Sequence, residues 1–222
     1  MKAESDRRPR ADAARNIEHI LCAAREVFAR VGPDAPLDEV AKHAGVGVRT
    51  LHRHFPRKED LVRATLDRAL TPDFAHAITR ARSAPNPLHG LTALIEETLT
   101  LVDRERATLA AANNPGALTS AIAEPLLDTL TALTEGARHA GLVRADLTPD
   151  DVHRLLGMLT SVLWGMEPGD QGWRRYVILI LDALSPTATT PLPPAPPLRP
   201  ASTGAECSPD WRTGGMSGKS RP

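Results

Sequence analysis

The sequence predicts an all-α protein in which a small N-terminal helix-turn-helix domain precedes a larger helical body. Apolar residues recur at helical spacing through most of the chain, whereas the strict alternation of a half-buried strand is rare. Apolar residues make up 41% of the 222 positions and aromatic residues only 3%, which favours aliphatic helix packing over a β-sandwich. The third observation is a pair of short helices joined at a glycine, the pattern of a helix-turn-helix.

The expected helices are separated by breaks that contain glycine, proline or asparagine. They cover about 11–31, 36–43, 48–54, 58–80, 88–112, 117–123, 125–140, 149–165 and 172–184. In the first of them an apolar stripe runs from Ile17 to Phe28. Pro36 suits the first turn of the second helix, Gly45 breaks the chain before the third, and Pro56 ends the third.

The remaining helices are delimited by similar signals. Pro72 lies inside the connecting helix and is expected to kink or split it. Breaks at 83–87 and 113–116 bound the next helix. Gly141 suits a helix C-terminus, and Thr148 before a proline suits the N-cap of the helix that follows.

These elements and the composition divide the chain into four parts. They are an N-terminal arm (1–10), the helix-turn-helix domain (11–57), a ligand-binding and dimerisation body (58–184, with 58–80 as the connecting helix) and a disordered tail rich in Pro, Gly and Ser (185–222). The net charge is zero, but residues 1–64 are slightly basic and residues 65–184 are acidic. That distribution favours an anion-binding domain on a body that does not bind anions.

The basic segment 48–58 has the character of a DNA-reading helix. Leu51 and Phe55 are four residues apart and share the inner face of the short helix. The outward-facing side chains are then cationic or small and polar, as a major-groove helix requires. The candidate DNA contacts are Val48, Arg49, Thr50, His52, Arg53, His54 and Lys58. Lys58 begins the next helix, whose free N–H groups favour a phosphate.

The order of motifs in this region resembles the TetR (tetracycline-repressor-like) family of transcription factors. The motifs are ILCAA to Phe28, LDEVAKHAGV (37–46), TLHRHF (50–55) and KEDL (58–61). The resemblance implies a homodimeric regulator that binds a near-palindromic operator in double-stranded DNA and is released by a small molecule. A repressor is expected, although activation stays an alternative, as does a ligand-binding or protein-interaction module that keeps the motif as a scaffold.

Two positions of the third helix depart from the family pattern. His52 stands where the family usually has tyrosine, and its imidazole donates to phosphate better when protonated, so we expect DNA affinity to rise on acidification. Arg49 stands where glycine is common, and it is able to reach guanine or phosphate, or to point to solvent. Val48 suits contact with a thymine methyl group.

The last two helices predict a dimer interface. The helix 172–184 is apolar nearly all round, so it must be buried nearly all round, which a terminal helix achieves by packing on a second copy. The resemblance implies the same four-helix interface, and packing within one chain is the alternative. The expected interface residues are Leu155, Leu159, Val162, Met166, Trp173, Val177, Ile180, Leu181 and Leu184.

The middle helices are the expected effector site. Their inner faces are aliphatic with a few hydroxyl groups, so a mainly apolar ligand is expected, and ordinary core packing is the alternative. The candidate lining residues are Leu94, Thr98, Leu101, Leu127, Leu130 and Trp164.

Other functional classes lack support in the sequence. No nucleophile triad, glycine-rich phosphate loop or CxxC motif occurs, so no enzyme and no cofactor are expected. His52 and His54 diverge on a helix, so no metal site is expected. The two cysteines are far apart, and no signal peptide or 18-residue apolar run is present, so a cytoplasmic protein without a membrane partner is expected.

Overall fold

The computed structural model describes residues 7–112, 120–187 and 190–194, and all regular secondary structure in these ranges is helical. The all-α prediction is therefore confirmed. The helices are α1 (Arg7–Val31), α2 (Leu37–His43), α3 (Val48–His54), α4 (Lys58–Arg82), α5 (Pro87–Arg104), α6 (Arg106–Ala111), α7 (Ser120–His139), α8 (Pro149–Trp164) and α9 (Trp173–Ala183).

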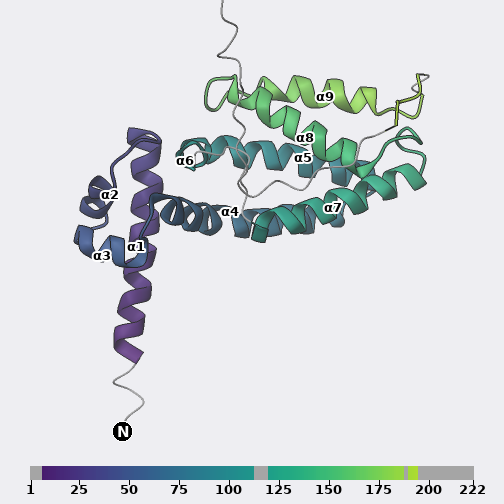
Figure 1. Cartoon of the computed structure of the whole chain (residues 1–222). Coiled ribbons are helices and arrows are strands. Elements are labelled where there is room, and N and C mark those ends of the chain that lie inside the picture. The colour runs from purple at the N-terminus through teal and green to yellow at the C-terminus, as the bar shows by residue number, and fades with distance from the viewer. Residues whose placement is uncertain (1–6, 113–119, 188–189, 195–222) are drawn as a thin grey trace, which may run out of the picture.

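The helices form a head (α1 to α3) and a body (α4 to α9), as Figure 1 shows. In the head, α1 stands across the direction of the body helices, and α2 and α3 lie on one side of it. Helix α4 runs from the head into the body, where α5 and α7 pack along it. The α8–α9 pair covers the far side of the body.

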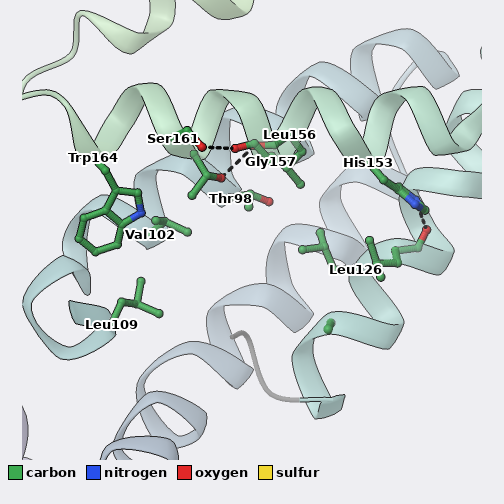
Figure 2. A pocket seen from close by; sticks show the side chains of 12 residues that line it. Thr98, Val102, Leu109, Leu126, His153, Leu156, Gly157, Ser161 and Trp164 are labelled. Atoms are coloured by element: carbon green, nitrogen blue, oxygen red, sulfur yellow. Dashed lines mark hydrogen bonds between the residues drawn. The ribbon is translucent and has the colours of Figure 1, made fainter. Parts of the chain in front are cut away.

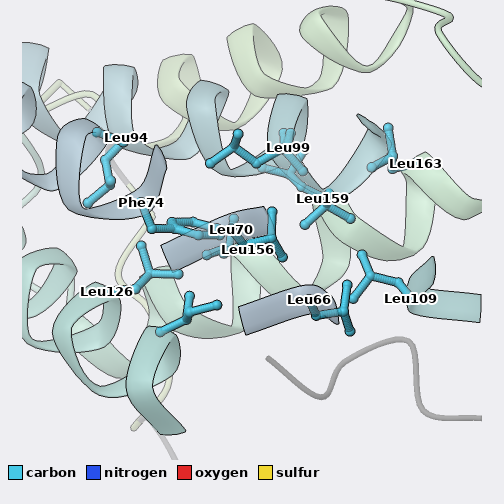
Figure 3. Close-up of a cluster of buried hydrophobic side chains, with 14 of the residues drawn as sticks. Leu66, Leu70, Phe74, Leu94, Leu99, Leu109, Leu126, Leu156, Leu159 and Leu163 are labelled. Atoms are coloured by element: carbon cyan, nitrogen blue, oxygen red, sulfur yellow. The ribbon is translucent and has the colours of Figure 1, made fainter. Parts of the chain in front are cut away.

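Aliphatic side chains from α4, α5, α7 and α8 fill the body core (Figure 3). Leu70 and Phe74 of α4 lie among them, at most 2% exposed. Gly90 permits the close approach of α4 and α5, because a Cβ atom at this position would overlap the carbonyl oxygen of Ala81. Because these helices pack side by side along their length, the surfaces of the body that stay free for binding lie at its edges.

The expected helix 88–112 is wrong, because the chain breaks into α5 and α6 at Glu105. The Glu105 side chain is 1% exposed and accepts hydrogen bonds from two arginines. Arg25 of α1 donates from Nη2 to Oε1 at 2.5 Å and from Nε to Oε2 at 3.0 Å. Arg104 donates from Nε to Oε1 at 3.0 Å. The break therefore points the buried carboxylate of Glu105 toward the head. No glycine or proline marks this break in the sequence.

Two prolines interrupt their helices less than expected. Helix α4 is not split at Pro72, and α7 continues through Pro125, where two helices were expected. Both prolines are exposed, so water can reach the carbonyl that each leaves without a helical N–H partner. Residues 117–119 of the expected helix 117–123 lie outside the described residues.

The expected terminal segments also differ in extent. Helix α1 begins at Arg7, inside the expected arm 1–10. The expected tail starts at 185, and its described part contacts the α7–α8 loop through Thr190 and Leu192. Residues 1–6 and 195–222 lie outside the described residues.

Candidate nucleic-acid interface and effector pocket

Helices α2 and α3 meet at a sharp turn that fixes the orientation of α3. Gly45 has φ +68°, a conformation that glycine adopts without the strain a Cβ would cause. The N–H groups of Gly45 and Val46 donate to the carbonyl groups of Lys42 and Ala41, which closes the end of α2. Leu51 is fully buried and Phe55 is 8% exposed, so α3 is anchored on its inner face.

The outer face of α3 carries cations without protein partners. Arg49, His52 and Arg53 are exposed, and none makes a hydrogen bond or ion pair within the described part of the chain. Val48 is exposed at the first position, and Thr50 is half-buried. Unpaired guanidinium groups on a short, anchored helix suit phosphate oxygens and guanine edges.

Three neighbouring basic side chains are less free than those on the outer face, and two of them, Arg57 and Lys58, have partners within the protein. Arg57 donates to both carboxylate oxygens of Asp60, at 3.0 and 3.2 Å, and this hydrogen-bonded pair raises the pKa of Arg57 and lowers the pKa of Asp60. His54 is half-buried, and its Nε2 atom has no partner among the described residues. Lys58 is turned inward, away from the expected phosphate position.

Lys58 contacts α1 and the loop that follows it. Its Nζ atom donates to the carbonyl oxygen of Pro33 at 2.6 Å and lies 5.7 Å from the ring centre of Phe28. A cation over a ring face gains electrostatic attraction. The ammonium group thus joins the start of α4 to the α1–α2 loop, and its expected contact with a phosphate stays a prediction.

The body contains a pocket of about 330 Å³ between α5, α7 and α8, with Leu109 of α6 on its wall (Figure 2). Of the six expected lining residues, Thr98, Leu127 and Trp164 lie on this wall. Leu94, Leu101 and Leu130 do not line it but pack into the hydrophobic core of the body, and they are corrected. Sequence reasoning missed the rest of the wall: Val102, Leu109, Ala123, Leu126, His153, Leu156, Gly157, Thr160 and Ser161.

The far side of the body exposes an apolar surface on α8 and α9. Met158 is 61% exposed, Ile178 59% and Leu179 52%, and Tyr176 is also exposed. Sequence reasoning missed these four because it took one stripe of each helix for both the core and the interface. The helix 172–184 is apolar on its outer side as well, and that was the available signal.

The expected dimer interface is partly wrong. Leu159, Trp173, Val177 and Leu184 are at most 6% exposed inside their own subunit, where they hold α8 and α9 on the body. Five expected residues are half-buried at the edge of the exposed surface: Leu155, Val162, Met166, Ile180 and Leu181.

No helix in the described ranges is long and apolar enough to cross a lipid bilayer. Among the described residues, no three His, Cys, Asp or Glu side chains gather as metal ligands would.

A helix-turn-helix head on a helical body is the architecture of a class of DNA-binding regulator. Known proteins agree with this assignment. Residues 20–65 match the family of bacterial regulatory proteins known as the tetR family. A TetR transcription regulatory protein from Mycobacterium vanbaalenii is 30% identical over 79% of this chain and 98% of its own, with a TM-score of 0.52.

Two further proteins are similar over different extents. The transcriptional repressor BepR of Brucella suis is 38% identical over 97 residues, which span 43% of this chain and 46% of BepR. The regulator FadR of Bacillus subtilis, solved with stearoyl-CoA, shares the fold with a TM-score of 0.60 at 16% identity, over 78% of this chain and 99% of its own. The chain belongs to the TetR family, whose members are DNA-binding transcriptional regulators and not enzymes.

Proposed function

We propose that the protein is a homodimeric repressor that inserts α3 of each subunit into successive major grooves of a near-palindromic operator. The observation that carries this proposal is the outer face of α3, where Arg49, His52 and Arg53 are exposed without a partner in the described ranges, above the buried Leu51. Arg49 and Arg53 supply base-edge or phosphate contacts, and His52 donates to phosphate. Val48 and Thr50 face the bases at the start of the helix.

The dimer forms through the exposed apolar surface of α8 and α9. Met158, Ile178 and Leu179, on two helices that pack together, are each more than half exposed, and clustered exposed apolar side chains mark interaction sites. With a two-fold axis beside these helices, the same surface of each subunit packs on its copy in the other subunit. Burial of each large apolar side chain contributes about 1.5–3 kcal/mol, and each such contact occurs twice in a symmetric dimer.

An effector in the pocket reaches the head through α6. Leu109 of α6 lies on the pocket wall, and Glu105 at the start of α6 accepts hydrogen bonds from Arg25 of α1. A ligand that displaces α6 therefore changes the position of α1, and with it the spacing of the two heads. The effector weakens DNA binding to the extent that it prefers the displaced state.

Selection of bound DNA from a random duplex pool, with the full chain at low ionic strength, tests the proposal. We expect a palindromic sequence whose half-site centres are about one helical turn or a multiple of it apart. A protein that is folded and dimeric by light scattering yet enriches no sequence would exclude the proposed function. Gel shift with the recovered sequence and with a scrambled duplex then measures specificity.

The Arg25–Glu105 contact has its own test in a double-mutant cycle of operator affinity. Arg25→Leu removes the contact between α1 and α6, and Glu105→Leu removes the carboxylate that accepts it, so the double variant removes nothing further from this contact. We expect the two effects to be non-additive, since the residues act through one contact. Strictly additive effects would show that the contact does not position the head.

A further inference from the structure

The pocket is elongated along α8. His153, Gly157, Thr160 and Trp164 line it at a spacing of four, three and four residues, which places them on one face of the helix. Figure 2 shows His153 and Trp164 at opposite ends of this row. Their backbone positions are 11 residues apart, or about 16 Å along the axis. A volume of about 330 Å³ over this length suits a narrow ligand.

Gly157 opens the middle of this wall. A Cβ atom added at Gly157 would meet no atom within 4 Å, so no neighbouring helix requires the glycine. Glycine is also among the least favourable residues for a helix interior. Its effect in this position is to leave space in the pocket.

The pocket wall carries no formal charge. Among the described residues that line it there is no Lys, Arg, Asp or Glu, and His153 is the one ionisable side chain. A charged ligand would leave water without a counter-ion, which is unfavourable in an apolar site. The wall therefore favours an uncharged molecule.

The hydroxyl groups on the wall present lone pairs to a ligand. Three hydroxyls use their protons on carbonyl oxygens of their own helix: Thr98 to Leu94 at 2.7 Å, Thr160 to Leu156 at 2.9 Å and Ser161 to Gly157 at 3.1 Å. A hydroxyl oxygen whose proton is engaged in this way accepts further hydrogen bonds but donates none.

His153 adds a further acceptor. Its Nε2 atom lies 3.3 Å from the carbonyl oxygen of Leu127, which can only accept, and 3.4 Å from the Thr131 hydroxyl, which can accept as well as donate, so we assign the proton to Nε2. In the neutral ring, Nδ1 then carries a lone pair, and this atom is buried without a partner among the described residues. The indole N–H of Trp164, also without a described partner, is the donor on the wall.

We propose that this pocket binds an uncharged, elongated hydroxylated hydrocarbon, whose hydroxyl protons are donated to the Thr98, Thr160, Ser161 and His153 acceptors. The inference rests on the proposed function, since it names the ligand class of the same effector site. A wall with four acceptors and one donor discriminates against esters, which donate no hydrogen bond, and against carboxylates, which also bring a charge.

Three eight-carbon probes test the ligand class: octan-1-ol, methyl heptanoate and octanoate. Binding to the full chain is measured by calorimetry, with ligand-detected NMR as a second readout. We expect the alcohol to bind about three- to tenfold more tightly than the ester, the difference that one hydrogen bond makes, and octanoate to bind most weakly. Equal affinities, or a preference for octanoate, would overturn the proposal.

Matched threonine variants test the acceptor role. Thr98→Val and Thr160→Val each remove a wall oxygen at nearly constant volume, and they should reduce the preference for the alcohol over the ester. Thr134→Val is the control, because Thr134 is also buried and donates to its own helix, at Leu130, but does not line the pocket. An equal loss of preference in all three variants would contradict the assigned oxygens.

Gly157→Leu tests the location. The added side chain should fill the pocket and abolish octan-1-ol binding, whereas Ala75→Leu on the exposed side of α4 should leave it unchanged. Circular dichroism and light scattering establish that both variants are folded and keep the wild-type oligomeric state. Unchanged alcohol binding in folded Gly157→Leu would place the ligand elsewhere.

Gel shift on the same samples separates this inference from the proposed function. Alcohol preference without DNA binding would exclude the repressor and keep the ligand class. DNA binding without alcohol preference would keep the repressor and exclude the ligand class.

Discussion

Two surfaces of this molecule expose groups that ordinary packing would cover, and the two surfaces have opposite chemistry. The outer face of α3 exposes Arg49 and Arg53, which have no ion-pair partner in the described part of the chain. The outer face of α8 and α9 exposes Met158, Ile178 and Leu179. The first surface suits a polyanion, and the second suits another copy of itself.

Several other arginines in the described part of the chain are paired with carboxylates. Arg106 pairs with Asp103 at 2.7 Å, Arg80 pairs with Glu97 at 2.8 Å, and Arg144 binds Asp146 with two hydrogen bonds. Arg175 of α9 is exposed without a described partner, as Arg49 and Arg53 are, so the absence of a partner points to DNA contact only together with a place on α3. The overall charge of the chain is zero and gives no such indication.

A substitution in the exposed apolar surface of α8 and α9 is expected to give the largest effect, which is on dimer stability. Ile178→Asp places a charge and its two-fold copy at the proposed interface and removes two buried side chains, worth about 3–6 kcal/mol in total. We expect the dimer dissociation constant to rise by about a hundredfold or more, as measured by analytical ultracentrifugation. Ala75→Asp, on the exposed side of α4, is the control, and equal effects would refute the assigned surface.

The second-largest effect is expected from a substitution of Leu51, the buried residue that anchors α3. Leu51→Ala removes a fully buried side chain from the head, and such truncations cost about 2–5 kcal/mol. We expect a lower midpoint in urea unfolding and loss of operator binding, with dimerisation unchanged because α8 and α9 lie far from the head. A variant that binds the operator normally would show that α3 does not depend on this anchor.

Arg49 and Arg57 provide a matched comparison on the charged surface. Arg49→Ala should weaken operator binding by about 1–3 kcal/mol, whereas Arg57→Ala should have a smaller effect because Arg57 is paired with Asp60. Gel shift over a range of salt concentrations measures both variants. A larger loss for Arg57→Ala would refute the inference from pairing.

The smallest effect concerns the tail. Hydrogen bonds from Arg144 and from the Leu192 N–H lower the pKa of Asp146 below its usual range. The contribution of this contact is therefore present above the ordinary carboxyl pKa and is lost as the pH falls through the lowered one. We expect Asp146→Asn to speed proteolysis near Leu192 at neutral pH, and the wild type to match it only in strong acid. Identical cleavage rates at neutral pH would contradict the contact.

Much of the head could be predicted from the sequence, because its signals are local. Gly45 and Pro56 set the limits of α3, and the spacing of Leu51 and Phe55 identified its buried face. Lys58 was the exception, since its sequence position places it at a helix start but does not reveal that its long side chain folds back on Pro33.

The body was harder to predict because its features depend on contacts between distant segments. The break at Glu105 arises from Arg25, 80 residues earlier. The pocket wall combines positions from four helices, and the sequence identified only Thr98, Leu127 and Trp164 among the described residues that line it. Trp173 is buried and Ile178 is exposed on the same helix, and because apolar residues extend beyond the buried face of α9, the sequence alone did not separate the core side chains from the exposed ones.

The buried carboxylate of Glu105 limits how freely these regulators can be recombined. A chimera that joins this body to the head of a relative lacking an arginine at the position of Arg25 would leave an acidic group enclosed with only Arg104 to neutralise it. The exchange should therefore carry both residues, or replace both. The two halves of the molecule are thus coupled through one side-chain contact as well as through the covalent helix that joins them.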